Sequence, residues 1–520
     1  MRERLARTMR TGAVAAVAGF ALVLAACSGG GSGTTGGDGT GGDEPRHLGV
    51  ITPAPFVSWD PIAAFTPYGG GLYYQAVYDT LIREDASGEL QPNLATGWEY
   101  DDSLTTLTMD LRSDVTFTDG AAFDADAAVA NLERTRVTPG PRIADLANVT
   151  SVTAVDADTI ELVLSAPDPG LVEQLARAAG QMASPASLDA GTFDAPVGSG
   201  PYVLDAANTV DGESYAFVRN EDYWNAEAWG FDSVTVQWVP DPSARLNALK
   251  AGQVNATAVE FTQLEEAASA GLTAMEFGGG LVGIQFLDLA GDSPISDVRV
   301  RQAINYALDA DALSEAFSAG TGRVSDQPFG PHNAGFVDSL EDHYTHDVAK
   351  AKQLLAEAGY PDGVTITLPD SSGAFPGLPI MDAIVQQLGE AGITVEVVDS
   401  ALDFPEIVNQ MFTAAYPAWV TQWALASDWN VVSQWLLPSS TFNPFHVENP
   451  EVQALIDDVR GSTGEDQVKA YQALNTFLVD QAWGAWLYAT PYGYAHDDTV
   501  VAQEHLGEQS AWLGDLSPAE

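Results

Sequence analysis

Five large aromatic side chains lie within a span of 20 residues late in the chain: Tyr416, Trp419, Trp423, Trp429 and Trp435. Aromatic rings give broad, flat contact surfaces at little cost in conformational entropy, and each indole adds a polar N–H. This pattern is typical of a cleft that binds an organic ligand, although tryptophans also fill hydrophobic cores. We therefore expect at least two of the five to line a cleft, with Trp423 as the first candidate.

The sequence gives little indication of a catalytic site. The sequence contains no HExxH, no GxSxG and no SxxK motif. The spacing of His343 and His346 could place two imidazoles on one metal ion, but it implies no third ligand, and a polar loop explains both. Paired carboxylates could hydrolyse glycosides, yet close pairs arise by chance among 72 Asp and Glu residues. We predict a non-catalytic protein without cofactor or metal; a secreted hydrolase with a carboxylate site is the alternative from another class.

Strand-like and helix-like patterns alternate from about residue 45 onward and predict an α/β body. In the clearest unit, Asp347 precedes a helix, and a strand at 364–368, a helix at 380–391 and a strand at 393–397 follow. Strand, helix and strand of these lengths predict a right-handed crossover between parallel strands.

Two other segments predict further elements of this body. An apolar stripe over residues 298–317 predicts a helix that turns near Asp309. Alternating apolar residues at 104–117 predict a pair of strands, and Asp124 is expected to cap the helix that follows.

The first 26 residues have the parts of an export signal. Four arginines precede an apolar run from Ala13 to Ala26, which is too short to span a bilayer comfortably. The run ends in Leu-Ala-Ala-Cys, where Cys27 is the single cysteine of the chain. This ending resembles the bacterial lipobox, whose cysteine is lipidated and becomes the new N-terminus; an ordinary secretory signal is the alternative. We predict a signal peptide at 1–26, lipidation of Cys27, a flexible tether at 27–44, and anchoring on the extracytoplasmic face of the cell membrane.

The chain is strongly acidic, with 21 Lys and Arg against 72 Asp and Glu and a net charge of −51 over 520 residues. Loss of residues 1–26 would change the net charge to −54. Such a surface excludes sequence-independent binding to nucleic acid and argues against docking on anionic lipid. Hydrophobic residues make up 46% of the chain, and its length predicts more than one domain. We expect a monomer.

Six strings occur in an order that identifies a family. They are YDTLIR at 78–83, LRSDVTFTDGAAFDADAAVANL at 111–132, PVGSGPY at 196–202, NEDYW at 220–224, DVRVRQAINYALD at 297–309 and DVAKAKQLLAEAGYP at 347–361. Together they resemble the peptide/nickel-type family of bacterial extracellular solute-binding proteins that serve ABC importers. The resemblance runs from about Trp59 to the region of Trp486.

The resemblance implies an α/β, two-lobed clamp of the class II periplasmic-binding-protein type, which closes on its ligand about a hinge. It also implies an additional domain on one lobe. The implied parts are a first lobe from residues 45–82, 197–281 and 488–520, an extra domain at 83–196, and a second lobe at 282–487.

The resemblance also implies where a ligand would bind. In peptide-binding relatives, a tryptophan is followed three residues later by an aspartate that pairs with the α-ammonium of the peptide. Trp423 matches that tryptophan, but position 426 is Ala, and the nearest acid is Asp428. Either Asp428 takes over the role, or the ammonium site is absent and the ligand is not a simple peptide; Asp428 as an exposed loop residue is equally compatible. Trp59 and Tyr68 stand where family members often line the mouth of the cleft.

We therefore predict a lipid-anchored receptor that captures a short peptide and delivers it to an ABC permease. An oligosaccharide or a metal chelate would suit an aromatic cleft equally well, and presentation of the ligand to a sensor without import also stays open. The candidate ligand contacts are Trp423, Trp419, Asp428, Trp429, Tyr416, Trp59 and Tyr68.

Overall fold

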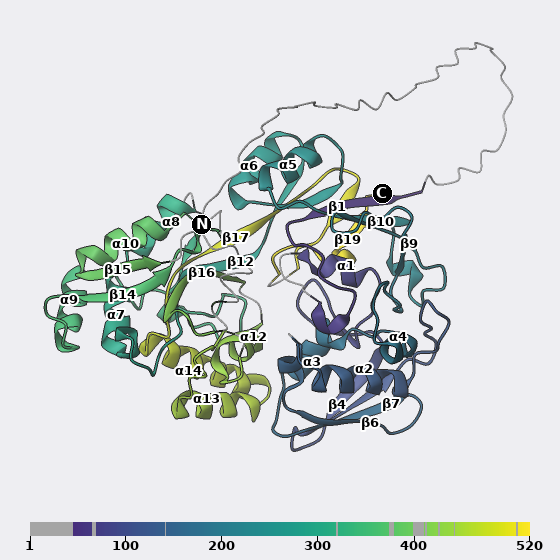
Figure 1. The fold of residues 1–520 in the computed structure, drawn as a ribbon, viewed down its shortest axis with the longest axis horizontal. Coiled ribbons are helices and arrows are strands. Elements are labelled where there is room, and N and C mark those ends of the chain that lie inside the picture. Colours follow the sequence, from purple (N-terminus) through teal and green to yellow (C-terminus); the bar gives the residue numbers. More distant parts are fainter. Residues whose placement is uncertain are drawn as a thin grey trace, which may run out of the picture. The chain divides into compact units, whose positions relative to one another are not determined.

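Two long antiparallel strands, β12 (Thr273–Phe286) and β17 (Gly484–His496), pair with each other toward one end of the largest sheet in this computed structural model (Figure 1). The structure describes residues 45–64, 69–140, 142–318, 321–373, 379–398, 410, 413–424, 427–440, 442–505 and 508–519. Within these ranges the sheet has nine strands in the order β16-β12-β17-β11-β1-β10-β9-β8, with β13 paired to β17. The remaining strands are β1 (His47–Thr52), β8 (Tyr202–Leu204), β9 (Ser214–Arg219), β10 (Ser233–Trp238), β11 (Ala256–Val259), β13 (Arg323–Val324) and β16 (Ala418–Ala424).

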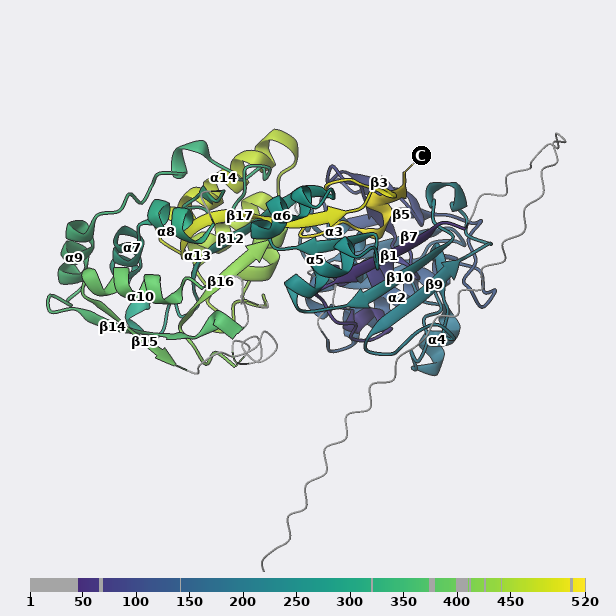
Figure 2. The ribbon, with the colours of Figure 1, turned by 90° about the horizontal axis from the view of Figure 1, so that it is seen from above.

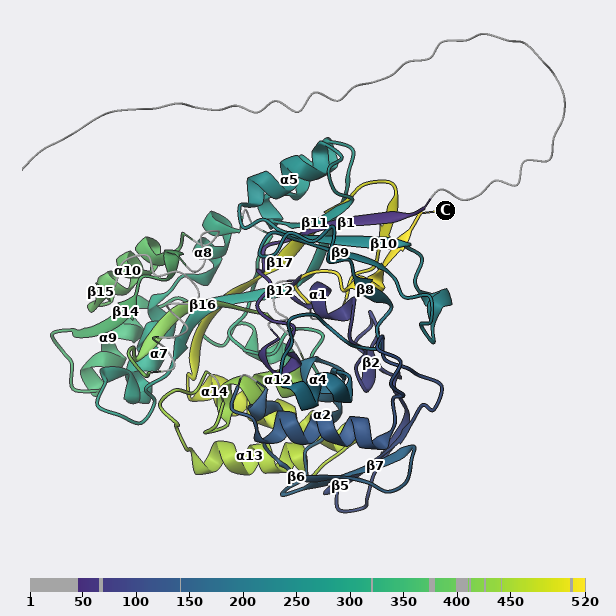
Figure 3. The same ribbon diagram turned by 45° about the vertical axis from the view of Figure 1, so that its right-hand side comes forward.

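The pairing of β12 with β17 is irregular near its centre. The register shifts between Phe277 and Gly280 and again between Val282 and Gly283. A Cβ atom at Gly283 would lie 2.4 Å from the backbone oxygen of Ala485, so a side chain there would force the strands apart. Figure 3 shows the two strands side by side along their length.

The expected lobe boundaries, 281/282 and 487/488, fall inside these two strands. Residues 45–520 form one compact unit, so the division into lobes stays a prediction.

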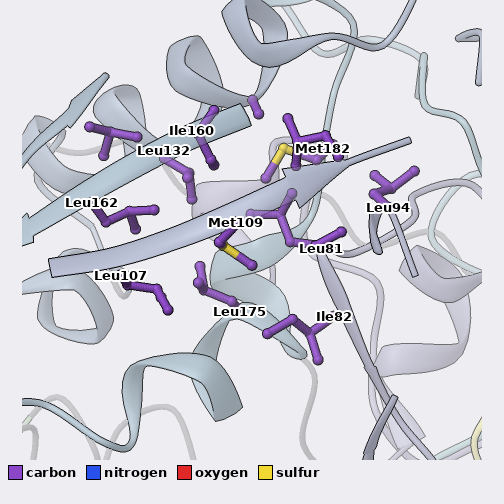
Figure 4. Packing of buried hydrophobic residues seen from close by; sticks show 14 of the residues in the cluster. Leu81, Ile82, Leu94, Leu107, Met109, Leu132, Ile160, Leu162, Leu175 and Met182 are labelled. Carbon is purple, nitrogen blue, oxygen red and sulfur yellow. The ribbon is translucent and has the colours of Figure 1, made fainter. Parts of the chain in front are cut away.

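A four-stranded antiparallel sheet lies within the expected extra domain. Its order is β4 (Ala95–Tyr100), β5 (Thr106–Leu111), β7 (Thr159–Leu164) and β6 (Val149–Ala154), and α2 (Ala125–Val137) packs against β6 and β7. Figure 4 shows Leu107, Met109, Ile160 and Leu162 of this sheet packing with Leu132 of α2, all of them fully buried. Burial of this apolar surface is the main favourable contribution to the folding of the region. Two short helices, α3 (Leu171–Leu175) and α4 (Pro185–Ala190), and the hairpin of β2 (Ile82–Glu84) with β3 (Leu90–Pro92) complete it.

One expectation for this region is confirmed and one is wrong. Asp124 caps α2 by accepting a hydrogen bond from Ala127 N at 2.9 Å. The expected second strand at Val115 and Phe117 is absent from this described segment, because a turn containing Gly120, at φ +87°, closes directly after Phe117. The pairing there is an isolated bridge between Thr116 and Ala122.

The expected strand–helix–strand unit is confirmed. The strands β14 (Val364–Pro369) and β15 (Ile393–Val398) pair in parallel, and α10 (Met381–Glu390) lies between them in the chain. Figure 2 shows α7 (Val298–Ala307), α9 (Val348–Glu357) and α10 gathered beside the two strands.

Aspartate caps set the starts of two of these helices. Asp347 accepts a hydrogen bond from Lys350 N at 2.9 Å and begins α9. Asp309 accepts one from Ala312 N at 3.0 Å and begins α8 (Ala310–Phe317), which explains the expected turn between α7 and α8.

The remaining helices are α1 (Gly71–Gln75), α5 (Pro242–Lys250), α6 (Leu264–Ser269), α12 (Asp428–Val431), α13 (Pro450–Arg460) and α14 (Gly464–Asp480). A π-helical turn, Val432–Leu436, continues α12, and α13 packs on α14. Near the C-terminus, β18 (Val500–Ala502) pairs with β19 (Leu516–Pro518). No helix in the described ranges has the length and apolar character that crossing a bilayer requires.

Candidate ligand-binding site

A cavity of about 340 Å³ is lined by segments that are far apart in the sequence. Residues 84–88 and 169–177 come from the expected extra domain, whereas 332–334, 427–428 and 467–471 come from the expected second lobe. This volume is in the range of small-molecule sites. We call it the main cavity. Its lining residues are Glu84, Ser87, Gly88, Pro169, Gly170, Glu173, Arg177, His332, Asn333, Ala334, Ser427, Asp428, Gln467, Val468 and Tyr471.

Asp428 lies in the wall of the main cavity at the first residue of α12. Its carboxylate accepts hydrogen bonds from the backbone N–H groups of Ala334, at 2.9 Å, and Gly335, at 2.6 Å. Burial raises the pKa of Asp428 even though these bonds oppose the shift. Asp428 is therefore a half-buried carboxylate that is fixed by backbone hydrogen bonds, and not an exposed loop residue.

A second carboxylate, Glu173 of α3, faces the same cavity. Ser427 is the residue before Asp428, and its Oγ donates a hydrogen bond to Glu173 Oε2 at 2.5 Å. Burial raises the pKa of Glu173 to about 7; the charges of Glu84 and Asp428 act in the same direction, and Ser427 and Arg177 oppose them. Sequence reasoning did not single out Glu173, because nothing local distinguishes it from the other acids.

Arg177 supplies the guanidinium of the cavity wall. It makes ion pairs with Glu84, at 3.0 Å, and with Glu508, at 2.6 Å. Burial disfavours its charge, but the two carboxylates outweigh that effect and hold the pKa of Arg177 above its ordinary value. The cavity wall thus contains three carboxylates, Glu84, Glu173 and Asp428, against one guanidinium that is already paired.

His505 ties the C-terminal segment to this charge cluster. Its side chain is fully buried, with Nδ1 3.0 Å from Asp515 Oδ2 and Nε2 3.8 Å from Glu84 Oε1. The ring also stacks on Trp512, with the ring centroids 4.1 Å apart. Burial alone would lower the pKa of His505, but Asp515 and Glu84 outweigh it and raise the pKa to about 9.

Gly170 and Trp429 make a close contact at the edge of the main cavity. A Cβ atom at Gly170 would lie 1.8 Å from Trp429 Cδ1, so the indole packs directly on the backbone before α3. Trp429 is buried, and its ring also lies 5.3 Å from the guanidinium carbon of Arg460.

Three other aromatic residues expected to contact the ligand, Trp423, Trp419 and Tyr416, lie outside the lining of the main cavity. Trp423 of β16 is half-buried and contacts the rings of Trp435 and Phe442, and its Nε1 has no hydrogen-bond partner among the described residues. Trp419 and Tyr416 are buried, and Trp419 Nε1 donates to Gln285 Oε1 at 2.8 Å. None of these residues lines the main cavity; a ligand contact by any of them stays a prediction.

At the other end of the chain, Trp59 is buried in an aromatic cluster with Phe56, Tyr74 and Tyr215. Tyr78 donates its hydroxyl to the backbone oxygen of Trp59 at 2.7 Å. Tyr68 lies outside the described residues, so its expected place at the mouth of the cleft stays a prediction.

The two histidines whose spacing could suit a metal ion, His343 and His346, lie near separate carboxylates. His343 Nε2 lies 3.6 Å from Asp480, and His346 Nδ1 lies 3.5 Å from Asp309. Within the described ranges, no three His, Cys, Asp or Glu side chains gather in a way that could hold a metal ion.

The fold is that of a class II periplasmic binding protein, as two solved structures show. One is the binding protein AgaA in complex with agropinic acid from A. tumefaciens R10, with a TM-score of 0.79 and 23% identity over 91% of this chain and 99% of that chain. The other is DppA from Helicobacter pylori in complex with the peptide STSA, also with a TM-score of 0.79, with 20% identity over 92% of this chain and 99% of that chain.

The sequence comparisons identify the family. The profile of the bacterial extracellular solute-binding proteins, family 5, matches residues 89–443. The glutathione-binding protein GsiB of Pectobacterium atrosepticum is 28% identical over 433 residues, which are 79% of this chain and 82% of that protein. GsiB of Salmonella paratyphi A is 30% identical over 62% of this chain and 64% of that protein. The chain belongs to family 5 of the bacterial extracellular solute-binding proteins; it is a binding protein of the ABC-transporter class and not an enzyme.

The charge of His505 makes the stability of the fold depend on pH. Its folded pKa, about 9, exceeds the 6.5 of an ordinary histidine. Its stabilising contribution is therefore complete below pH 6.5 and is lost as the pH rises through 9, by about 3 kcal/mol in all. We expect the difference in free energy of unfolding between wild type and His505→Gln, measured by urea titration, to shrink by that amount between pH 6 and pH 9.5.

The groups that face His505 are Asp515, Glu84 and Glu508, and all three stay in place in this variant. His446→Asn, at an exposed histidine, is the control, and its difference from wild type is measured over the same pH range. A constant difference for His505→Gln would contradict the assignment of a charged His505.

Proposed function

We propose that this protein is a lipid-anchored receptor that captures a short peptide in the main cavity and delivers it to an ABC importer. The observation that carries the proposal is the excess of carboxylates over free cationic groups in the cavity wall. A peptide brings an N-terminal ammonium that such a wall can hold. The peptide complex of the similarly folded DppA supports the ligand class.

The ammonium subsite that we propose lies between Glu173 and Asp428. Burial raises the pKa of both carboxylates, and the charge of Asp428 adds to the rise at Glu173. A positive charge placed between them would satisfy both and would be held in a setting of low dielectric, where charge-assisted hydrogen bonds are strong. In this proposal Asp428 takes over the role of the aspartate that is missing at position 426.

The acidity of the cavity also bears on the other ligand classes. Glutathione is the ligand named for GsiB, and Fe(III)-EDTA is bound to NikA from Brucella suis, a protein with 22% identity and a TM-score of 0.75. Both ligands carry a net negative charge at neutral pH, but glutathione also carries an α-ammonium of the kind that the proposed subsite would hold. The guanidinium that lines the main cavity, Arg177, is already engaged by Glu84 and Glu508, so it offers little to an anion.

Contacts among residues around the main cavity also support the proposal that the ligand is captured by closure about a hinge. The Gly170–Trp429 contact and the Ser427–Glu173 hydrogen bond join the segment around α3 to the start of α12. The irregular centre of β12 and β17, with glycines at 278, 279, 280 and 283, offers a place at which these segments could swing apart. A ligand that contacts both segments stabilises the closed arrangement.

The ammonium subsite predicts how the protein distinguishes peptides. Trialanine should bind at least tenfold more tightly than N-acetyl-trialanine, measured by isothermal titration calorimetry. Asp428→Asn and Glu173→Gln should each remove most of this difference in affinity, because each variant leaves only one of the two carboxylates to hold the ammonium. Glu465→Gln, which neutralises an exposed acid at the start of α14, is the matched control and should retain it. Equal affinity of the wild type for both peptides would remove the ammonium subsite.

The lipid anchor makes a separate prediction. Wild-type protein expressed in a bacterium with a lipoprotein pathway should partition into the detergent phase of Triton X-114, because acyl chains on Cys27 add buried CH₂ groups. Cys27→Ser should move it to the aqueous phase, and Ser32→Ala should leave it in the detergent phase. Detergent partitioning of the Cys27→Ser protein would show that another feature holds it on the membrane.

A further inference from the structure

A second cavity, of about 200 Å³, lies next to the contact between Gly170 and Trp429. Its lining residues include Asp145, Asp168, Trp429 and Arg460. Asp168 directly precedes Pro169 and Gly170 of the main cavity, and Trp429 directly follows Asp428. The two cavities are therefore lined by consecutive residues of the same two chain segments, 168–170 and 428–429.

Polar atoms without hydrogen-bond partners gather around this second cavity. In the described ranges, Asp168 Oδ1, Asp145 Oδ2 and Arg460 Nε have no hydrogen-bond partner. Asp168 is only 7% exposed, and the side chain of Asp145 is only 6% exposed. A buried polar atom left without a partner is costly, so such a group of atoms in one place needs an explanation.

The two carboxylates have partners for their charge, but each keeps an oxygen for a further donor. The other oxygen of Asp168 accepts from Asn148 Nδ2 at 2.8 Å, and Asp145 Oδ2 makes an ion pair with Arg142 at 3.3 Å that lacks hydrogen-bond geometry. Burial raises the pKa of both aspartates. For Asp168, the Asn148 amide, the Arg460 charge and the Gly170 backbone N–H oppose the shift, and for Asp145 the charges of Arg142 and Arg177 do.

We propose that the second cavity is a subsite for a cationic side chain of the bound peptide, whose ammonium or guanidinium donates hydrogen bonds to Asp168 Oδ1 and Asp145 Oδ2. The volume accommodates the end of a lysine or arginine side chain, and the ring of Trp429 provides an apolar wall for its methylene groups. This inference rests on the proposed function, since it needs a peptide in the neighbouring main cavity. An inorganic cation could supply the same charge, so the experiment must separate the two sources.

The test uses tripeptides of alanine in which one position is lysine or its uncharged counterpart norleucine, with all three positions examined by isothermal titration calorimetry. At one position, we expect the lysine peptide to bind at least tenfold more tightly than the norleucine peptide. Asp168→Asn should reduce this ratio to within twofold while trialanine still binds. Asp189→Asn, which removes the same charge at an exposed site of the expected extra domain, should keep the full ratio. If Asp168→Asn does not fold, Asp145→Asn provides the same test.

Each other result decides against the inference. Equal binding of lysine and norleucine peptides at every position, in a protein that binds trialanine, would overturn the subsite and leave the proposed function standing. Failure to bind any of the tripeptides would overturn the proposed function and the subsite with it. A rise in melting temperature with calcium chloride or sodium chloride alone, lost in Asp168→Asn and coupled to loss of the lysine preference, would assign the cavity to an inorganic cation.

Discussion

The Arg177 guanidinium joins three parts of the chain that are far apart in sequence. It pairs with Glu84 on β2 and with Glu508 in the C-terminal segment, and it follows α3, which carries Glu173. Removing one partner of such a largely buried pair leaves an uncompensated charge, at a cost of about 3–5 kcal/mol. The position of the cavity wall therefore depends on this ion pair, and His505 extends it by linking Glu84 to Asp515.

The same cluster sets the polarity of the main cavity. Because Arg177 is occupied by Glu84 and Glu508, the carboxylates of Glu173 and Asp428 are left without a comparable partner. Burial raises the pKa of both. A ligand cation would compensate both buried carboxylates, and the proposed preference for an N-terminal ammonium rests on this charge arrangement. The net charge of −51 is compatible with a cationic ligand, but the local arrangement and not the overall charge carries the argument.

Much of the fold could be predicted from local sequence. Asp347 and Asp309 mark helix starts in the sequence because a capping side chain bonds a backbone N–H only three residues away. The alternation of apolar residues in β14 and β15 is visible in the sequence even though both strands are short. The pair of strands expected at 104–117 was half wrong, because the turn at Gly120 outweighs the alternation of Val115 and Phe117. The family itself was recognisable because its motifs are short, ordered strings.

The candidate site was only partly predictable. Asp428 was singled out by its distance from Trp423, and it does line the main cavity. Trp423, Trp419 and Tyr416 do not line the main cavity, and because tryptophans look alike in sequence whether they face a ligand or a core, a ligand contact by any of them stays a prediction. Glu173 and Asp168 gave no signal, because their partners Ser427 and Arg460 are more than 250 residues away in the sequence.

The most direct test of a receptor for peptides is native mass spectrometry of the mature protein purified without added ligand, followed by sequencing of whatever is released. A capture protein that holds an ammonium in an acidic cavity should carry a mixture of short peptides with free N-termini. A single sugar or metal chelate as the bound species, or peptides whose N-termini are blocked, would contradict the account.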